Sequence, residues 1–112
     1  MIEKTVLDFM SEALKPTPVY MEVPENKPAS FVTIEKTGSS KRNKHGYAMF
    51  AFQSWSGSMY GAAVLNESVK AAAERLIECS EITASRLNSD YNFTDTASKH
   101  YRYQAVFDIY HY

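Results

Sequence analysis

Two segments of the chain repeat their hydrophobic residues at helical spacing. Near the start these residues are Ile2, Val6, Phe9, Met10 and Ala13. They predict an amphipathic helix over residues 2–14 that ends before Pro16. The longer repeat consists of Ala62, Leu65, Val69, Ala72, Ala73, Leu76 and Ile77. It predicts a second helix over residues 59–79, with an N-cap in the preceding Ser56-Gly57-Ser58.

Five other segments have the apolar clustering or alternation of β-strands. They are Val19–Val23, Phe31–Lys36, Tyr47–Trp55, Ile82–Tyr91 and Tyr101–Tyr112. The polar segments Thr37–Lys44 and Asn92–Lys99 are predicted to be loops. The order α-β-β-β-α-β-β with short polar connections predicts one α+β domain over residues 1–112. We expect a two-layer sandwich, with a mainly antiparallel sheet and two helices on one face.

Two of the predicted strands carry features that point to association. Tyr47–Trp55 is apolar on both faces, so we expect the helices on one side and a second cover, such as a neighbouring subunit, on the other. Tyr101–Tyr112 is predicted to pair with it, and twelve extended positions reach about 40 Å. Its last residues are expected to be unmatched and to meet a neighbour. The interface candidates are Tyr47, Met49, Trp55, Tyr101, Tyr103, Tyr110, His111 and Tyr112.

Composition and charge exclude several protein classes. The net charge is −1, so no overall field attracts nucleic acid or a membrane surface. Cys79 is the single cysteine, which fits a reducing compartment. The first residues lack the apolar stretch of a signal peptide, and no apolar run is long enough to span a membrane.

No group of residues in the sequence predicts catalysis or metal binding. Cys79 ends the second helical repeat, where a structural thiol is expected. The histidines His45, His100 and His111 lie far apart in the sequence, without ligand spacing. Asp8 and Glu12 are one turn apart but lie on the polar face of the first predicted helix. We therefore expect no catalytic residue, no metal and no cofactor.

Basic residues gather in the first long loop, which is expected to be a flexible hairpin over about residues 37–46. The cluster comprises Lys36, Lys41, Arg42, Lys44 and His45. Taken alone, such a loop is either a mobile, solvated hairpin tip, which is slightly favoured, or a contact to DNA phosphates that does not read sequence. A second cluster, Lys99–Arg102, is predicted to lie at the opposite end of the strand pair.

Most of the chain resembles the tail-terminator, or tail-completion, proteins in the neck of long-tailed bacteriophages, also called head-tail joining proteins. A first helix leads into Pro18-Val19-Tyr20 and a proline-containing connector, Val23–Pro28. A strand, Phe31–Glu35, and a polar hairpin follow. The next strand ends in Gln53–Ser58, an alanine-rich helix follows directly, and the chain closes on a strand.

The resemblance implies a structural virion protein, located in the phage neck and assembled in the bacterial cytoplasm. Such proteins form a ring, typically a hexamer, that caps the tail tube. The implied partners are further copies of the chain, the tail tube protein, a head-completion or connector protein, and genomic DNA passing non-specifically through the lumen. The resemblance implies no catalytic residue. On this resemblance the hairpin Lys36–His45 is expected to face the lumen or the next ring, with Lys41, Arg42 and Lys44 near DNA or an acidic neighbouring surface.

Three alternatives stay open from the sequence. The chain is also compatible with another neck or minor capsid component, such as a head-closure protein. A small nucleic-acid-binding regulator would use the same basic loop and stack bases on Tyr47, Phe50 or Tyr103. An enzyme with a dispersed site is the third alternative.

Overall fold

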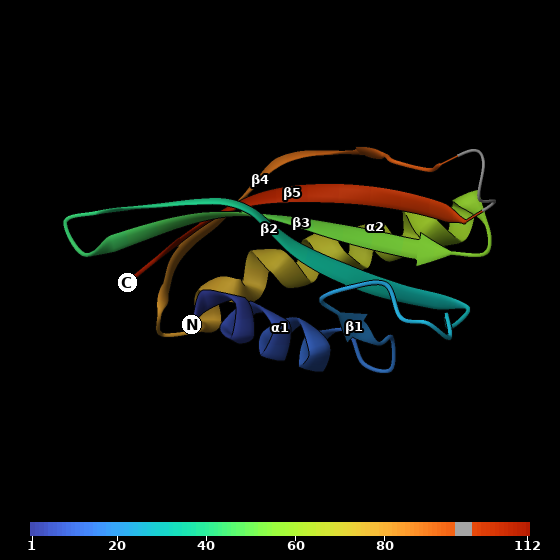
Figure 1. Cartoon of the computed structure of the whole chain (residues 1–112), viewed down its shortest axis with the longest axis horizontal. Coiled ribbons are helices and arrows are strands. Elements are labelled where there is room, and N and C mark those ends of the chain that lie inside the picture. The colour runs from blue at the N-terminus through green and yellow to red at the C-terminus, as the bar shows by residue number, and fades with distance from the viewer. Residues whose placement is uncertain (96–99) are drawn as a thin grey trace.

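The computed structural model describes residues 1–95 and 100–112, which form two helices and a five-stranded sheet (Figure 1). The order of helices and strands is the predicted one. The elements are α1 (Ile2–Ala13), β1 (Val19–Tyr20), β2 (Ser30–Arg42), β3 (His45–Ser56), α2 (Met59–Glu74), a short 3-10 helix (Arg75–Glu78), β4 (Ile82–Asn92) and β5 (Tyr101–His111).

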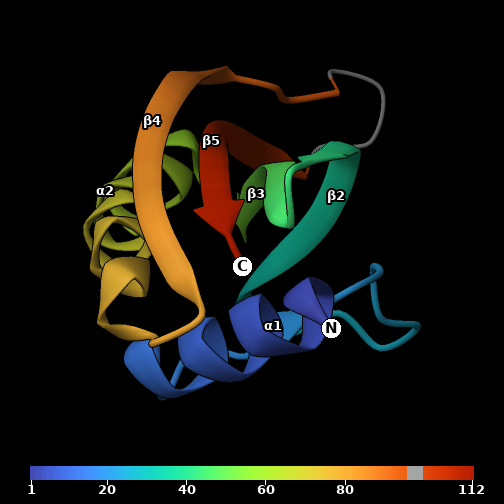
Figure 2. The ribbon, with the colours of Figure 1, turned by 90° about the vertical axis from the view of Figure 1, so that its left-hand side faces the viewer.

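The strands lie in the order β1-β2-β3-β5-β4. All neighbouring pairs are antiparallel except β1 and β2, which are parallel. Both helices cover the same face of the sheet, and β4 and β2 stand on either side of β5 and β3 in Figure 2. The predicted α+β sandwich with a mainly antiparallel sheet is therefore confirmed.

The hydrophobic core lies between the helices and one face of the sheet. Phe50 and Phe52 of β3 and Phe107 of β5 are fully buried there, against Val6 and Met10 of α1. Alternation along β3 and β5 sends every second side chain into this core. We call this side of the sheet the helix face and the opposite side the free face.

The predicted loop Thr37–Lys44 is wrong, because β2 continues through this segment to Arg42. A two-residue turn, Asn43-Lys44, joins Arg42 to His45, and both turn residues have positive φ, 51° and 67°. That backbone matches the twist of a tight hairpin, and asparagine tolerates it well. The segment was misassigned because nearly all of its side chains are polar and exposed on both faces.

Other predicted boundaries also shift. The first strand is only two residues long, since the chain turns away after Tyr20. The second helix ends at Glu74 and tightens into the 3-10 turn. β4 extends one residue beyond the prediction, to Asn92, and the rest of the predicted loop Asn92–Lys99 lies partly outside the described residues.

The prediction of an unmatched C-terminal end is wrong. Tyr110 pairs with Tyr47 and Ala84, and His111 pairs with Gly46 and Ile82. The Tyr112 amide donates a hydrogen bond to the carbonyl of Glu81 at 3.0 Å. The backbone of this end belongs to the sheet, although the side chains of Tyr110 and Tyr112 are exposed.

Deleting residues 110–112 should therefore destabilise the domain. The loss of strand pairing on two sides and of the Tyr112 hydrogen bond should lower the free energy of unfolding by about 3–5 kcal/mol, at roughly 1 kcal/mol per hydrogen bond. Urea denaturation of the truncated chain tests this, with Tyr112→Ala as the control because it keeps the backbone. Equal stability of the truncated and full chains would contradict the pairing.

Candidate interaction surfaces

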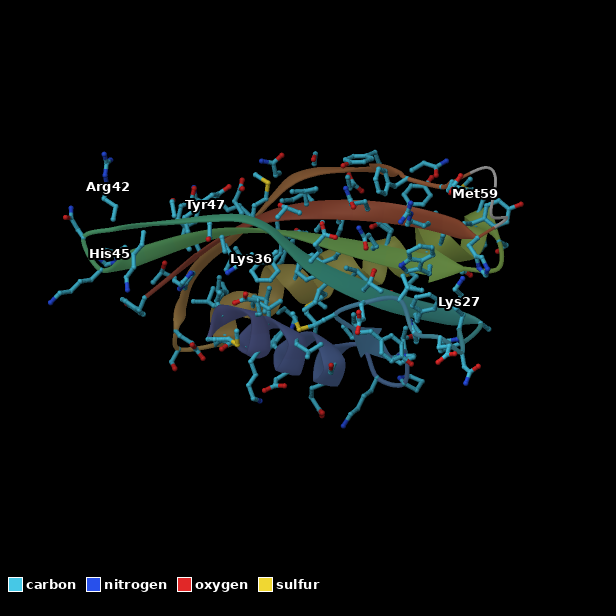
Figure 3. All side chains as sticks on the ribbon, viewed as in Figure 1. Lys27, Lys36, Arg42, His45, Tyr47 and Met59 are labelled. Carbon is cyan, nitrogen blue, oxygen red and sulfur yellow. The ribbon has the colours of Figure 1, made fainter. Side chains whose placement is uncertain are left out.

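The β2–β3 hairpin projects beyond both helices at one end of the molecule, which measures 45 × 24 × 24 Å (Figure 1). We call Lys41–His45 the hairpin tip; all five residues are exposed. Figure 3 shows Arg42 and His45 at this end and Lys27 at the other. The tight turn holds the cations of the tip away from the body of the domain.

Lys36 does not belong to this exposed group, contrary to the sequence-based expectation. Its Nζ lies 3.0 Å from Oε2 of Glu3 on α1, and both side chains are mostly covered. The hydrogen bond from Lys36 lowers the pKa of Glu3. This ion pair joins β2 to α1, so the charge of Lys36 is already compensated.

The three cations of the hairpin tip have no such compensation. Within residues 1–95 and 100–112, Lys41, Arg42 and Lys44 have no ion-pair partner. By contrast, Lys4, Lys15, Lys36, Lys70 and Arg75 each pair with a carboxylate. The tip is thus a compact positive charge on a chain of nearly neutral net charge.

The second basic cluster lies at the other end of the sheet, as expected. Ser56 of β3 pairs with Tyr101, whereas Gly46 pairs with His111. Arg102 is held between two rings, with its guanidinium carbon 4.6 Å from the centre of Trp55 and 4.5 Å from that of Phe93. Lys99 lies outside the described residues. Arg102 therefore links β3, which carries Trp55, to the segment after β4, which carries Phe93.

A chain of hydrogen bonds crosses all four long strands on the free face. The Trp55 indole donates to Thr33 Oγ1 at 3.0 Å, and the Thr33 hydroxyl donates to Gln53 Oε1 at 2.6 Å. The Gln53 amide donates to Gln104 Oε1 at 2.8 Å, and the Gln104 amide donates to the Tyr91 hydroxyl at 2.6 Å. We call Thr33, Gln53, Gln104 and Tyr91 the amide ladder.

Aromatic side chains extend this cover at the same end of the free face. The rings of Phe31 and Trp55 stack at 5.4 Å, and Tyr91 meets Phe93 edge to face at 5.8 Å. Phe31 and Ala51 are buried although no helix lies over them. These two residues are therefore buried within the single chain, whereas Tyr47, Met49 and Trp55 on the same face are only partly buried.

A second polar row lies nearer the hairpin tip. The Tyr47 hydroxyl donates to Asp108 Oδ1 at 2.6 Å, and the Asn88 amide donates to Asp108 Oδ2 at 3.1 Å. The hydrogen bond to Asp108, together with burial, raises the pKa of Tyr47 to about 12. The centres of the Tyr47 and Tyr110 rings are 5.2 Å apart, so the two rings contact each other beside this polar row.

The structure divides the eight interface candidates between two faces. Tyr47, Met49, Trp55 and Tyr110 alternate onto the free face, whereas Tyr101, Tyr103 and His111 alternate toward the helix face. Only Tyr110 and Tyr112 are strongly exposed, at 41% and 67%. The candidates therefore do not form one patch.

The side chains considered for catalysis lack the environment that reactivity needs. Burial, with Glu81 and Glu78 nearby, raises the pKa of the Cys79 thiol and disfavours the thiolate. Asp8 and Glu12 pair with Lys4 and Lys15 on an exposed helix surface.

The described residues contain neither a metal-ligating cluster nor a helix that could cross a membrane. No cluster of three or more metal-ligating side chains occurs in the part of the chain that the structure describes. Within that same part, neither helix has the length and apolar character needed to cross a bilayer.

No protein-family model and no curated protein matches the chain. The resemblance to tail terminators therefore stays a prediction.

The Tyr47–Asp108 contact predicts an unusual tyrosine titration. Because folding raises the pKa of Tyr47 above the ordinary value near 10, this contact stabilises the fold fully below pH 10. Its contribution is lost as the pH rises through about 12. Tyrosinate absorbance should show one late-titrating group that is missing in Tyr47→Phe. Titration of all eight tyrosines near the ordinary value in the folded protein would contradict this.

The amide ladder predicts that Gln53→Ala is costly. The variant leaves the buried Thr33 and Gln104 without their shared partner, so the free energy of unfolding should fall by about 1–3 kcal/mol. Thr37→Ala is the matched control, because its hydroxyl also donates to a neighbour but is exposed. Chemical denaturation of both variants checks the difference, and equal effects would show that the ladder adds nothing.

Proposed function

We propose that the chain is a non-catalytic structural protein of a bacteriophage virion, a ring-forming tail terminator. In this role it caps the tail tube and joins it to the head through a head-completion or connector protein. Six copies would form the ring, with genomic DNA passing through the lumen. The resemblance described from the sequence and the projecting hairpin support this proposal.

The hairpin tip is the observation that carries the proposal. A nearly neutral domain extends a tight hairpin whose three cations have no ion-pair partner among the described residues. Side chains exposed in this way are suited to a surface outside the subunit. In a ring, the tip faces the lumen or an adjacent subunit.

The free face fits a structural subunit better than a regulator that stacks nucleic acid bases. Phe50 does not lie on this face at all, because it is fully buried on the helix face and cannot stack on a base. The Tyr47 hydroxyl is bound to the Asp108 carboxylate, whose negative charge repels phosphate. Arg102 lies between two rings of the chain itself. Among the described residues, the hairpin tip holds three of the five exposed cations that lack an ion-pair partner, and the other two, Lys27 and Arg86, lie outside it.

Removing the charges of the tip tests the proposal. The variant Lys41→Ser, Arg42→Ser, Lys44→Asn keeps the turn, since asparagine accepts the positive φ of residue 44. Phage carrying it should give few infectious particles, while the melting temperature of the purified protein stays unchanged. The control is Lys4→Ser, Lys15→Ser, Lys27→Ser, which removes the same charge elsewhere. Normal phage yield from the tip variant would contradict the proposal.

A further inference from the structure

An open groove lies between α1 and the connector that follows β1. Leu7, Tyr20, Met21, Val23 and Pro24 form its apolar lining, and Glu22 and Glu25 also line it. Its volume is about 670 Å³. Met21 is 50% exposed and Val23 is 43% exposed, so the apolar lining is open to solvent.

The two carboxylates of the groove form no ion pair among the described residues, although Lys27 follows Glu25 by two residues in the connector. Both Glu22 and Glu25 are exposed. Apolar walls that carry two acidic groups suit long basic side chains, because their methylene stems pack on the walls while their charged ends reach the carboxylates. Lysine and arginine have this chemistry.

The hairpin tip supplies such side chains on the same molecule. The whole chain has twelve Lys and Arg against thirteen Asp and Glu. Setting aside Lys41, Arg42 and Lys44 leaves nine against thirteen, a net charge of −4 for the rest. The tip and the remaining surface are therefore complementary in charge.

The tip cannot reach the groove of its own chain. In Figure 1 the hairpin ends at the far left, whereas β1 and the connector lie below the right-hand half of the sheet. Figure 3 likewise places Arg42 and His45 at the opposite end from Lys27 of the connector. A contact between the two surfaces must therefore join different molecules.

We propose that the hairpin tip of one copy docks into the Glu22–Glu25 groove of a second copy. The two surfaces differ, so the contact is head-to-tail, and it gives a closed ring where the rotation from copy to copy closes. Lys41 and Arg42 alternate to opposite faces of the hairpin, so each lies along a different side of the groove, and their charged ends pair with the two glutamates. This inference rests on the proposed function in so far as both require self-association.

Charge reversal on each side tests the docking. Lys41→Glu with Arg42→Glu places like charges against the groove, and Glu22→Lys with Glu25→Lys places like charges against the tip. Each double variant alone should associate about tenfold more weakly than the natural chain. Light scattering on purified protein without nucleic acid, at low and high salt, measures the mass.

Mixing the two double variants gives the sharper result. The acidic tip of one variant matches the basic groove of the other, and the unchanged tip and groove match as well, so the mixture should assemble with alternating subunits. Lys4→Glu with Lys15→Glu is the control, since it makes the same change of charge at two exposed positions, one in α1 and one just after it. This control should assemble normally.

The outcomes separate this inference from the proposed function. Assembly that is unchanged by reversal of the groove, or failure of the mixture to recover, overturns the docking and leaves the ring proposal standing. A chain that stays monomeric and never binds tail tubes overturns both. Loss in each variant with recovery in the mixture supports the docking, because a role in DNA contact alone would not be restored by changing the groove.

Discussion

The antiparallel pairing of β3 with β5 is the contact on which the rest of the structure depends. Eleven residue pairs run from Gly46–His111 to Ser56–Tyr101 without a bulge. This unbroken register sends Phe50, Phe52 and Phe107 toward the helices and leaves Gln53 and Gln104 on the free face. A slip by one residue would exchange the two sets, placing amides under α2 and phenylalanines in water.

The two faces of the sheet are shielded from water in different ways. The helix face excludes water with apolar volume, in the usual manner of a sandwich. The free face has no second layer, and its polar groups satisfy one another across the strands while Trp55 and Arg102 cover the end. Since this part of the face is already satisfied, it has little to gain from a partner. Among the described residues, unpaired charges are instead grouped at the hairpin tip and in the groove.

The sequence predicted those elements that contact the core. Phe31–Lys36 and Tyr47–Trp55 alternate because one side of each is buried, and that alternation is visible in the residues. Thr37–Arg42 has solvent on both sides, so no pattern distinguishes its strand from a loop; Asn43 was the one signal for a tight turn. The ion pair of Lys36 with Glu3 and the amide ladder depend on strand register and helix placement, which neither composition nor periodicity contains.

The bulge in β2 determines on which face of the sheet each side chain at the end of the hairpin lies. Lys36 pairs with Phe50 and Gly38 with Met49, so Thr37 is an extra residue that reverses the alternation. Odd-numbered positions of β2 lie on the free face before the bulge, and even-numbered positions, including Arg42, lie there after it. One residue inserted or deleted between Lys36 and Gly38 would exchange the faces on which the later side chains of the hairpin lie, and the core residues would keep their positions. The face toward which the basic side chains of the hairpin tip point therefore depends on the length of β2 around the bulge and not on the packing of the core.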